Sequence, residues 1–258
     1  MTYDPTPAAR ALLEARQARR LVLPLPPAIA PTTEAEGAAV QHALARLLHA
    51  NPIAGFKIGA TGKRMQEYLG LSGPAAGFMK TVSRDTGTFR FADYIKPGVE
   101  CEVAVRLTRD LPPGSYTAET VAAAVGEFVA GIEIVENRYG DLKTLGTPTL
   151  IADQVYHVAA VLGFQGGVDW RALNIGALRG HMFIDGIERD AGLTTDLMGH
   201  PFTCLAFLAS SPVAAAFGGL RAGQCVMLGS VTPPVWLDGP ADVRVVFEGL
   251  PEVTVRLT

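Results

Sequence analysis

The sequence predicts an α+β fold in which a mixed β-sheet is curled or packed on itself, preceded by a small helical N-terminal part. Two amphipathic helical patterns precede residue 50, whereas short apolar runs bounded by turn residues follow residue 72. No regular alternation of strands and helices links these runs, so a parallel sheet built from βαβ units is not expected. We expect a mostly helical region over residues 1–71 and a β-rich region over residues 72–258.

The helical region contains two main helices and a short strand. Residues 5–20 carry apolar side chains at helical spacing among arginines, which predicts an amphipathic helix. Thr33 and Glu36 have the spacing of a capping box and start a second helix. An apolar run over residues 54–60 predicts a strand, and residues 64–69 predict a short helix.

The β-rich region contains eight further strand candidates. They cover residues 89–91, 100–107, 133–135, 173–178, 182–187, 224–228, 243–247 and 253–257. Asp185-Gly186 predicts a hairpin turn. Helices are expected over residues 117–129, 153–162 and 200–217, the last of them broken at Pro212.

The composition is that of a globular protein and argues against some classes of partner. Hydrophobic residues make up 48% of the 258 residues and charged residues 18%, and the net charge is -3. Lysine and arginine form no basic stripe, which argues against a nucleic acid or an anionic membrane as partner. Three widely spaced cysteines favour a reducing compartment. No signal-peptide pattern and no run of about 18 apolar residues occurs, so we expect a cytoplasmic protein.

Three glutamates on two predicted strands suggest a metal site. Alternation over residues 99–107 turns Glu100 and Glu102 to the same face, and Ile132 and Ile134 flank Glu133 in the same manner. Half-buried carboxylates that repel each other need a positive partner, and a hard divalent cation such as Mg²⁺ or Mn²⁺ meets that need. The alternative is that the Glu-x-Glu pair is simply the solvated face of a strand.

Two other stretches carry candidate functional groups. Lys57 lies on an apolar strand between two glycines, where it can hold a substrate carboxylate or move a proton. The alternative is an edge-strand lysine that opposes aggregation. Gly229-Ser230 ends another apolar strand and is either an anion-binding turn or a plain loop. The sequence contains no HxH or HExxH metal motif, no serine-nucleophile elbow and no phosphate-binding loop.

As a set, these residues resemble the 2-keto-4-pentenoate hydratase and 4-oxalocrotonate decarboxylase group of the fumarylacetoacetase superfamily. The similarity is carried by their order and spacing, including the gap of 31 positions from Glu102 to Glu133. The matching stretches are Gly55-Phe-Lys-Ile-Gly, Glu100-Cys-Glu-Val-Ala, Ile132-Glu-Ile-Val-Glu-Asn-Arg, Ile151-Ala-Asp, Gly199-His-Pro, Leu220-Arg-Ala-Gly and Gly229-Ser.

The resemblance implies a fold, a cofactor and site residues. The implied fold is a mixed β-sheet roll of the fumarylacetoacetase type around the metal, with a small helical N-terminal part, in a homo-oligomer. The implied ligands of Mg²⁺ or Mn²⁺ are Glu100, Glu102 and Glu133, and the implied catalytic residue is Lys57. The implied substrate-binding residues are Lys57, Gly77, Phe78, Gln154, Gly229 and Ser230.

Two stretches depart from the usual pattern of the group. Hydratases usually carry Pro-Asp-Phe-Gly where this chain has Ala75 and Ala76 between Pro74 and Gly77, so an acid that would touch the substrate is absent. The usual Ala-Asp-Asn-Ala-Ser run is replaced by residues 152–156, which introduces the larger side chains of Gln154 and Tyr156.

The expected activity is that of a lyase in aromatic compound catabolism. The first expectation is a hydratase that converts a 2-hydroxy-2,4-dienoate of the 2-keto-4-pentenoate type into a 4-hydroxy-2-oxo acid. The runner-up is a 4-oxalocrotonate-type decarboxylase, for which the missing acid at Ala75 leaves room. A related 2-oxo acid hydrolase is a third possibility. From a different class, the chain can be a non-catalytic metal-binding or assembly partner.

Overall fold

The computed structural model describes residues 3–258, apart from the side chains of Arg64, Tyr68 and Lys143. Its α-helices are α1 (Thr6–Gln17), α2 (Glu34–Leu47), α3 (Lys63–Leu69), α4 (Ala118–Ala122), α5 (Leu142–Leu145), α6 (Thr147–Ala152), α7 (Pro201–Ala209) and α8 (Pro212–Ala216). Its strands are β1 (Gly55–Gly59), β2 (Ala75–Met79), β3 (Ser83–Arg84), β4 (Thr86–Phe89), β5 (Pro97–Leu107), β6 (Val125–Glu136), β7 (His157–Leu162), β8 (Arg179–Ile184), β9 (Ile187–Leu193), β10 (Cys225–Ser230), β11 (Val235–Trp236), β12 (Ala241–Phe247) and β13 (Val253–Leu257).

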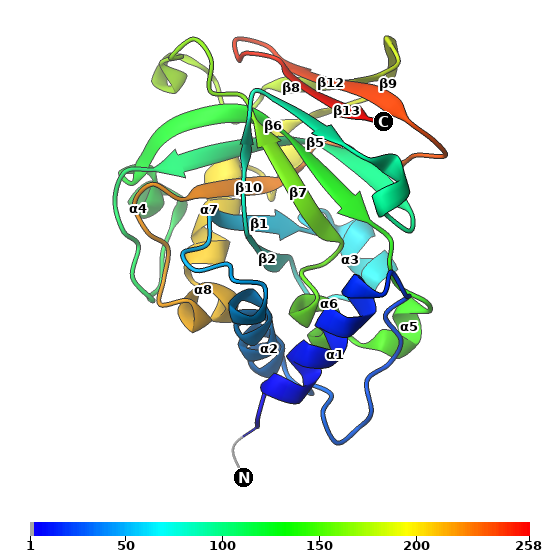
Figure 1. Ribbon diagram of the computed structural model, residues 1–258. Helices are drawn as coiled ribbons and strands as arrows, with labels where there is room; N and C mark the ends of the chain where they lie inside the picture. The colour runs from blue at the N-terminus through cyan, green and yellow to red at the C-terminus, as the bar shows by residue number, and fades with distance from the viewer. Residues whose placement is uncertain (1–2) are drawn as a thin grey trace.

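The strands form two mixed sheets, as the sequence predicts. The larger sheet has eight strands in the order β2-β1-β10-β5-β6-β7-β3, with β11 paired to β5, and the smaller has the order β4-β13-β12-β8-β9. The pairs β1 with β10, β3 with β7 and β4 with β13 are parallel, and the other pairs are antiparallel. Figure 1 shows the smaller sheet at one end of the molecule and the larger sheet between it and the N-terminal helices.

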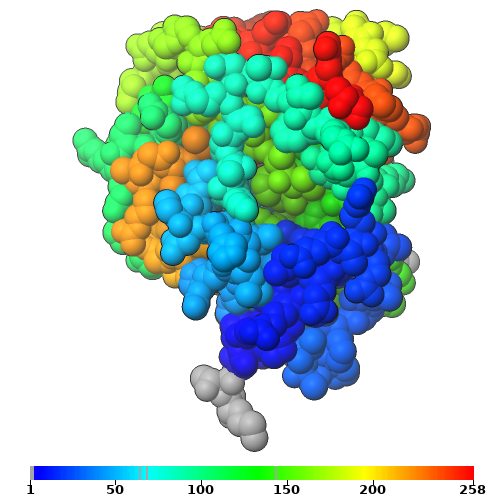
Figure 2. Space-filling view, in the orientation of Figure 1, coloured from blue at the N-terminus to red at the C-terminus, as the bar shows by residue number. Residues whose placement is uncertain are grey.

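The N-terminal helices cover the end of the larger sheet. The Thr33 hydroxyl accepts a hydrogen bond from the Glu36 N–H at 3.2 Å, so the predicted start of α2 is confirmed. The Glu36 carboxylate accepts from the Thr32 N–H, one residue before the partner that a complete capping box would use. In the space-filling view the N-terminal segment covers the lower part of this face and the C-terminal strands lie at the top (Figure 2).

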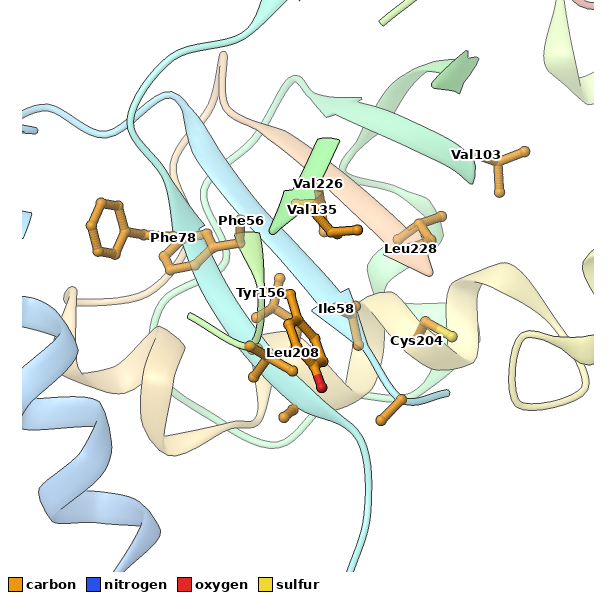
Figure 3. Close-up of a cluster of buried hydrophobic side chains, with 14 of the residues drawn as sticks. Phe56, Ile58, Phe78, Val103, Val135, Tyr156, Cys204, Leu208, Val226 and Leu228 are labelled. Atoms are coloured by element: carbon orange, nitrogen blue, oxygen red, sulfur yellow. The ribbon is translucent and has the colours of Figure 1, made fainter. Parts of the chain in front are cut away.

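The core lies where the larger sheet meets α7. Phe56 and Phe78 are directly paired on β1 and β2, and both are fully buried. Val226 on β10 and Leu208 on α7 belong to the same cluster (Figure 3). Each buried side chain of this kind contributes roughly 1.5–3 kcal/mol of transfer free energy. This core therefore holds β1 and β10 in place.

The segment Thr194–Ala216 is long and apolar enough to cross a membrane by composition alone, with a mean hydropathy of 1.2. In the structure it is divided into a 3₁₀ turn at Thr194–Asp196 and the two short helices α7 and α8. In the most apolar stretch of this segment, 61% is buried inside the protein. Packing inside the domain accounts for its apolar composition.

Three expected elements are wrong. Residues 153–162 are not a helix, because a turn precedes β7, which pairs with β6. The helix expected over residues 117–129 ends at Ala122, and β6 begins at Val125. No strand forms over residues 173–178. In the first two segments, alanine-rich sequence favours helix locally, but pairing with neighbouring strands decides the structure.

Gly55 at the start of β1 is required by close backbone packing. A Cβ added there would lie 1.8 Å from the Cys225 carbonyl oxygen on β10, whereas a Cβ at Gly73 would meet nothing within 4 Å. We predict that Gly55→Ala lowers the free energy of unfolding by about 1–3 kcal/mol or more, because the paired strands must separate. Denaturant unfolding of both variants measures this, with Gly73→Ala as the matched control. Equal stabilities of the two variants would contradict the packing argument.

Candidate active site

Three glutamates converge on one face of the larger sheet. Glu100 and Glu102 are two residues apart on β5, and Glu133 on β6 is paired directly opposite Glu100. Directly opposed residues, and residues two apart on one strand, project from the same face. One oxygen of each carboxylate lies within 4.8 Å of the others. The three carboxylates therefore form one cluster, as the alternation predicts.

Glu133 is fully buried and lies between a lysine and a histidine. The Lys57 Nζ on β1 lies 3.5 Å from Glu133 Oε1 and donates a hydrogen bond of 2.6 Å to the Val155 carbonyl. The His157 Nδ1 on β7 lies 2.8 Å from the same Oε1. The second oxygen, Oε2, has no hydrogen-bond partner among the described residues. Because an unpaired buried carboxylate oxygen is costly, we expect it to face a ligand.

Glu102 is positioned by an irregularity in the neighbouring strand. The pairing of β10 with β5 shifts between Met227 and Ser230, and Gly229 N–H donates to Glu102 Oε2 at 3.2 Å. Gly229 has a φ of 114°, and a Cβ there would lie 2.7 Å from a Thr61 side-chain carbon. Glycine is therefore needed at this position, because a side chain would be strained and would collide.

The protonation of the three carboxyls differs because their surroundings differ. Burial raises the pKa of Glu100 to about 8, and the charge of Glu133 adds to this effect. Burial and the same neighbour also raise the pKa of Glu102 well above its ordinary value. Burial disfavours the charge of Glu133 too, but Lys57 and the His157 hydrogen bond outweigh it and lower the pKa of Glu133. Burial lowers the pKa of His157, so a neutral imidazole can donate its Nδ1–H to Glu133.

The cluster fits a hard divalent cation. When all three carboxylates are ionised, they exceed the single ammonium of Lys57 by two negative charges. Carboxylate oxygens are the ligands that Mg²⁺ and Mn²⁺ prefer in proteins. Glu133 Oε2, which has no hydrogen-bond partner among the described residues, supplies a further oxygen. The donor set therefore suits the metal expected from the sequence.

A cavity of about 400 Å³ opens beside the carboxylates. Its lining residues are Gly59, Ala60, Thr61, Gly62, Met65, Glu100, Glu102, Tyr156, Asp196, Ser230, Val231, Thr232, Pro233, Pro234 and Trp236. A Cβ at Gly59 would lie 3.2 Å from the Lys57 Nζ. The absence of a side chain at Gly59 thus leaves the lysine next to the cavity.

A strained turn forms the side of the site opposite β10. Gln154, Val155 and Tyr156 have φ angles of 64°, 46° and 68°. Such left-handed conformations cost non-glycine residues about 1–3 kcal/mol each, and a β-branched residue there is an outlier. The turn presents the Val155 carbonyl to Lys57 and the Tyr156 side chain to the cavity.

Two arginines hold this turn through Asp153. Arg138 Nε donates to Asp153 Oδ2 at 2.6 Å, and Arg16 Nε donates to Oδ1 at 2.7 Å. Both guanidiniums also donate to the Asp153 backbone carbonyl, at 2.8 and 2.9 Å. Arg138 reaches the His157 carbonyl on the far side of the turn at 3.2 Å. Burial alone would raise the pKa of Asp153, but the two guanidiniums hold it below its usual range.

The expected substrate-binding residues divide into two groups. Ser230 lines the cavity, Gly229 precedes it, and Lys57 lies behind the lining residue Gly59. Gly77, Phe78 and Gln154 are not among the lining residues either. Gln154 donates to the Phe78 carbonyl at 2.5 Å and accepts from Arg16 at 2.7 Å. The expected contact of these three residues with a substrate stays a prediction.

Sequence reasoning did not identify His157, Tyr156 or Trp236 as site residues. His157 was placed on a helix, so its position across from Val135 on β6 could not be anticipated. Tyr156 was noticed only as a larger side chain in an altered motif. Trp236 follows two prolines at the end of the 230–236 segment. Its place close to the Gly229-Ser230 stretch is the one sequence feature that indicates a position in the site.

The Asp153 cluster predicts a large loss of stability on neutralisation. Asp153→Asn leaves Arg138 and Arg16 without their shared carboxylate, and breaking a buried ion pair in this way costs about 3–5 kcal/mol. Chemical denaturation measures the loss. The matched control is Asp242→Asn, which removes an exposed pair with Arg256 and is expected to change stability little. Similar losses in both variants would contradict the proposed role of the cluster.

The raised pKa of Glu100 predicts a pH dependence for the metal-free protein. The folded state retains a proton between the ordinary pKa of 4.5 and about 8 that the unfolded chain releases. This contribution to stability is full below pH 4.5 and is lost as pH rises through about 8. We expect the unfolding temperature in a chelator to fall as pH rises from about 4.5 to about 8, and to fall less in Glu100→Gln. Mn²⁺ should stabilise the protein more at the higher pH. A Glu100→Gln profile identical to that of the wild type would contradict the assignment.

Comparisons with known proteins show which enzymes the chain is similar to. The chain is 30% identical over 211 residues to a 2-hydroxyhexa-2,4-dienoate hydratase of Comamonas testosteroni, covering 80% of this chain and 78% of that protein. It is 30% identical over 250 residues to a 2-keto-4-pentenoate hydratase of Paraburkholderia phymatum, covering 95% and 94%. No protein-family model matches the chain.

The fold has a close counterpart among solved structures. The 4-oxalocrotonate decarboxylase of Pseudomonas putida G7, complexed with magnesium and adipate, superposes with a TM-score of 0.87 at 22% identity. The superposition covers 98% of this chain and 97% of that one. The relatives that are 30% identical over most of their length show that the chain belongs to the 2-keto-4-pentenoate hydratase and 4-oxalocrotonate decarboxylase group.

Proposed function

We propose that this protein is a divalent-metal-dependent hydratase that converts a 2-hydroxy-2,4-dienoate into a 4-hydroxy-2-oxo acid in aromatic compound catabolism. The observation that carries the proposal is the cluster of the half-buried Glu100 with the buried Glu102 and Glu133. Glu100 and Glu102 line a cavity, and Lys57 contacts Glu133 behind them. The hydratase names of relatives about 30% identical over most of the chain support the same reaction.

Glu100, Glu102 and Glu133 would hold Mg²⁺ or Mn²⁺, which when bound acts as a Lewis acid toward a substrate carbonyl oxygen. Lys57 and His157 both contact Glu133 and so fix its orientation. The Gly229 N–H does the same for Glu102. Partners of this kind, behind the ligands themselves, commonly determine ligand geometry.

Lys57 is the proposed catalytic residue. Hydration removes the proton of the dienol hydroxyl, delivers one proton to carbon 5 and one to carbon 3, and adds the hydroxyl of water to carbon 4. The two delivered protons balance those released by the dienol hydroxyl and by the water. The Lys57 ammonium has three N–H donors, of which one is donated to Val155 and another lies toward Glu133. The remaining donor and the open approach at Gly59 suit Lys57 to position the substrate carboxylate or to relay a proton.

A decarboxylase that acts on an oxalocrotonate-like diacid is the second candidate. Ala75 supplies no carboxylate, as expected for a reaction that activates no water there. Relatives named 4-oxalocrotonate decarboxylase are found at 28% identity over 79% of the chain.

The curvature of the larger sheet, the domain boundary, the cellular location and the oligomeric state are also proposals. We infer that the larger sheet curls into a β-roll around the metal, since Gln154 beside β7 bonds to Phe78 on the end strand β2. The division at residues 71 and 72 is retained as a prediction, although β1 pairs with β10 across it. A cytoplasmic homo-oligomer is likewise proposed.

The proposal predicts the effect of neutralising one ligand. Glu102→Gln should lower kcat for the metal-dependent consumption of 2-hydroxypenta-2,4-dienoate by roughly 100-fold or more, because an anionic metal ligand is lost. The reaction is followed by absorbance, and gain of one water by mass spectrometry. Glu127→Gln changes a partly exposed glutamate on β6 and serves as the control.

Each outcome has a separate meaning. Full activity in folded Glu102→Gln would overturn the site assignment. Loss of carbon dioxide from a diacid, without hydration of any dienoate, would establish the second candidate instead. Metal binding without turnover of either compound would leave a non-catalytic protein.

A further inference from the structure

We propose that the cavity selects dienoates that carry an uncharged, apolar substituent at carbon 5, and that Trp236 determines this preference. The inference rests on the proposed function, because it takes the carboxylate and 2-oxygen end of the substrate to lie at the glutamate cluster. It concerns the opposite end of the substrate.

Trp236 lies on the same sheet face as the glutamates, farther along β5. Trp236 is paired directly with Gly98 in the register of β11 and β5, and Gly98 and Glu100 are two residues apart. Two residues along a strand span about 7 Å. A chain that begins at Glu100 and runs along β5 therefore meets the indole ring beyond its reacting carbons.

The indole is seated as part of an aromatic wall. A Cβ at Gly98 would lie 2.7 Å from the Trp236 ring, so glycine lets the ring lie against the strand. The Trp236 and Tyr156 rings are edge to face at 5.7 Å, and Tyr156 and Tyr139 pack in the same way at 5.0 Å. Such pairs hold each other in a fixed arrangement.

Other residues that line the cavity are also apolar. Met65, Val231, Pro233 and Pro234 line the cavity together with the two aromatic rings. A cavity of about 400 Å³ is within the range of pockets that bind small organic ligands. An alkyl or aryl substituent would gain free energy by leaving water here.

A second carboxylate would be disfavoured at the same place. The described lining residues include no lysine, arginine or histidine, but they include Asp196 besides Glu100 and Glu102. Lys57 is already engaged with Glu133 and Val155. Lys96 is exposed, with its Nζ 5.9 Å from the indole centroid, and is not a lining residue. Burying an anion without a cationic partner is strongly unfavourable.

Turnover of a matched substrate series tests the inference. The series is 2-hydroxypenta-2,4-dienoate and its derivatives with methyl, propyl or carboxylate at carbon 5, each assayed with Mn²⁺. We expect kcat/KM to rise about 10-fold or more from the unsubstituted to the propyl compound, and to be lowest for the carboxylate compound. A carboxylate compound that is turned over best would overturn the inference and leave the metal centre intact.

Substitution of Trp236 assigns the preference to a residue. In Trp236→Ala, the ratio of kcat/KM for the propyl and unsubstituted compounds should fall toward one, whereas Trp236→Phe should keep most of it. An unchanged ratio in folded Trp236→Ala would overturn the role of the indole.

Binding of non-reacting acids separates failure of the inference from failure of the proposed function. Calorimetry with the Mn²⁺-loaded protein compares 2-oxopentanoate, 2-oxooctanoate and 2-oxoadipate. We expect 2-oxooctanoate to bind about 10-fold more tightly than 2-oxopentanoate, and 2-oxoadipate most weakly. This order with no dienoate turnover would refute the hydratase and keep the binding preference. Tightest binding of 2-oxoadipate would refute the preference, whatever the turnover.

Discussion

The structure depends on three carboxylates, two of them buried and one half-buried, that share one sheet face beside a single lysine. Glu100, Glu102 and Glu133 converge within 4.8 Å, and Lys57 balances only one of their charges. Burial raises the pKa values of Glu100 and Glu102. Without a cation the cluster therefore retains protons and carries less negative charge. Desolvation of the carboxylates and the repulsion between them therefore destabilise the metal-free fold, and a divalent cation would relieve this destabilisation.

The second constraint is the strained turn that borders the site. Gln154, Val155 and Tyr156 adopt left-handed conformations in succession. The chain tolerates them because Asp153 is held by the buried Arg138 and the half-buried Arg16. Arg16 belongs to α1 and Arg138 follows β6. The N-terminal helix thus helps to fix the carbonyl that orients Lys57, and this link explains why a helix remote from the carboxylates matters to the site.

The sequence predicts the parts of the site that depend on local patterns. Alternation along β5 is sufficient to align Glu100 with Glu102, and the apolar neighbours of Glu133 identify its strand. The turn at residues 154–156 cannot be predicted, because its conformation is locally unfavourable and is held by contacts distant in sequence. His157 was missed for the same reason, since its strand is defined by pairing with β6. The Thr33 cap and the Asp185-Gly186 hairpin, both local features, are confirmed.

The central claim is that the carboxylate cluster is a metal centre. Crystals of the protein grown with Mn²⁺ and measured for anomalous scattering test it most directly. We expect one strong anomalous peak within coordination distance of oxygens from Glu100, Glu102 and Glu133. A well-ordered protein with no peak there, or with a peak only at other residues, would contradict it.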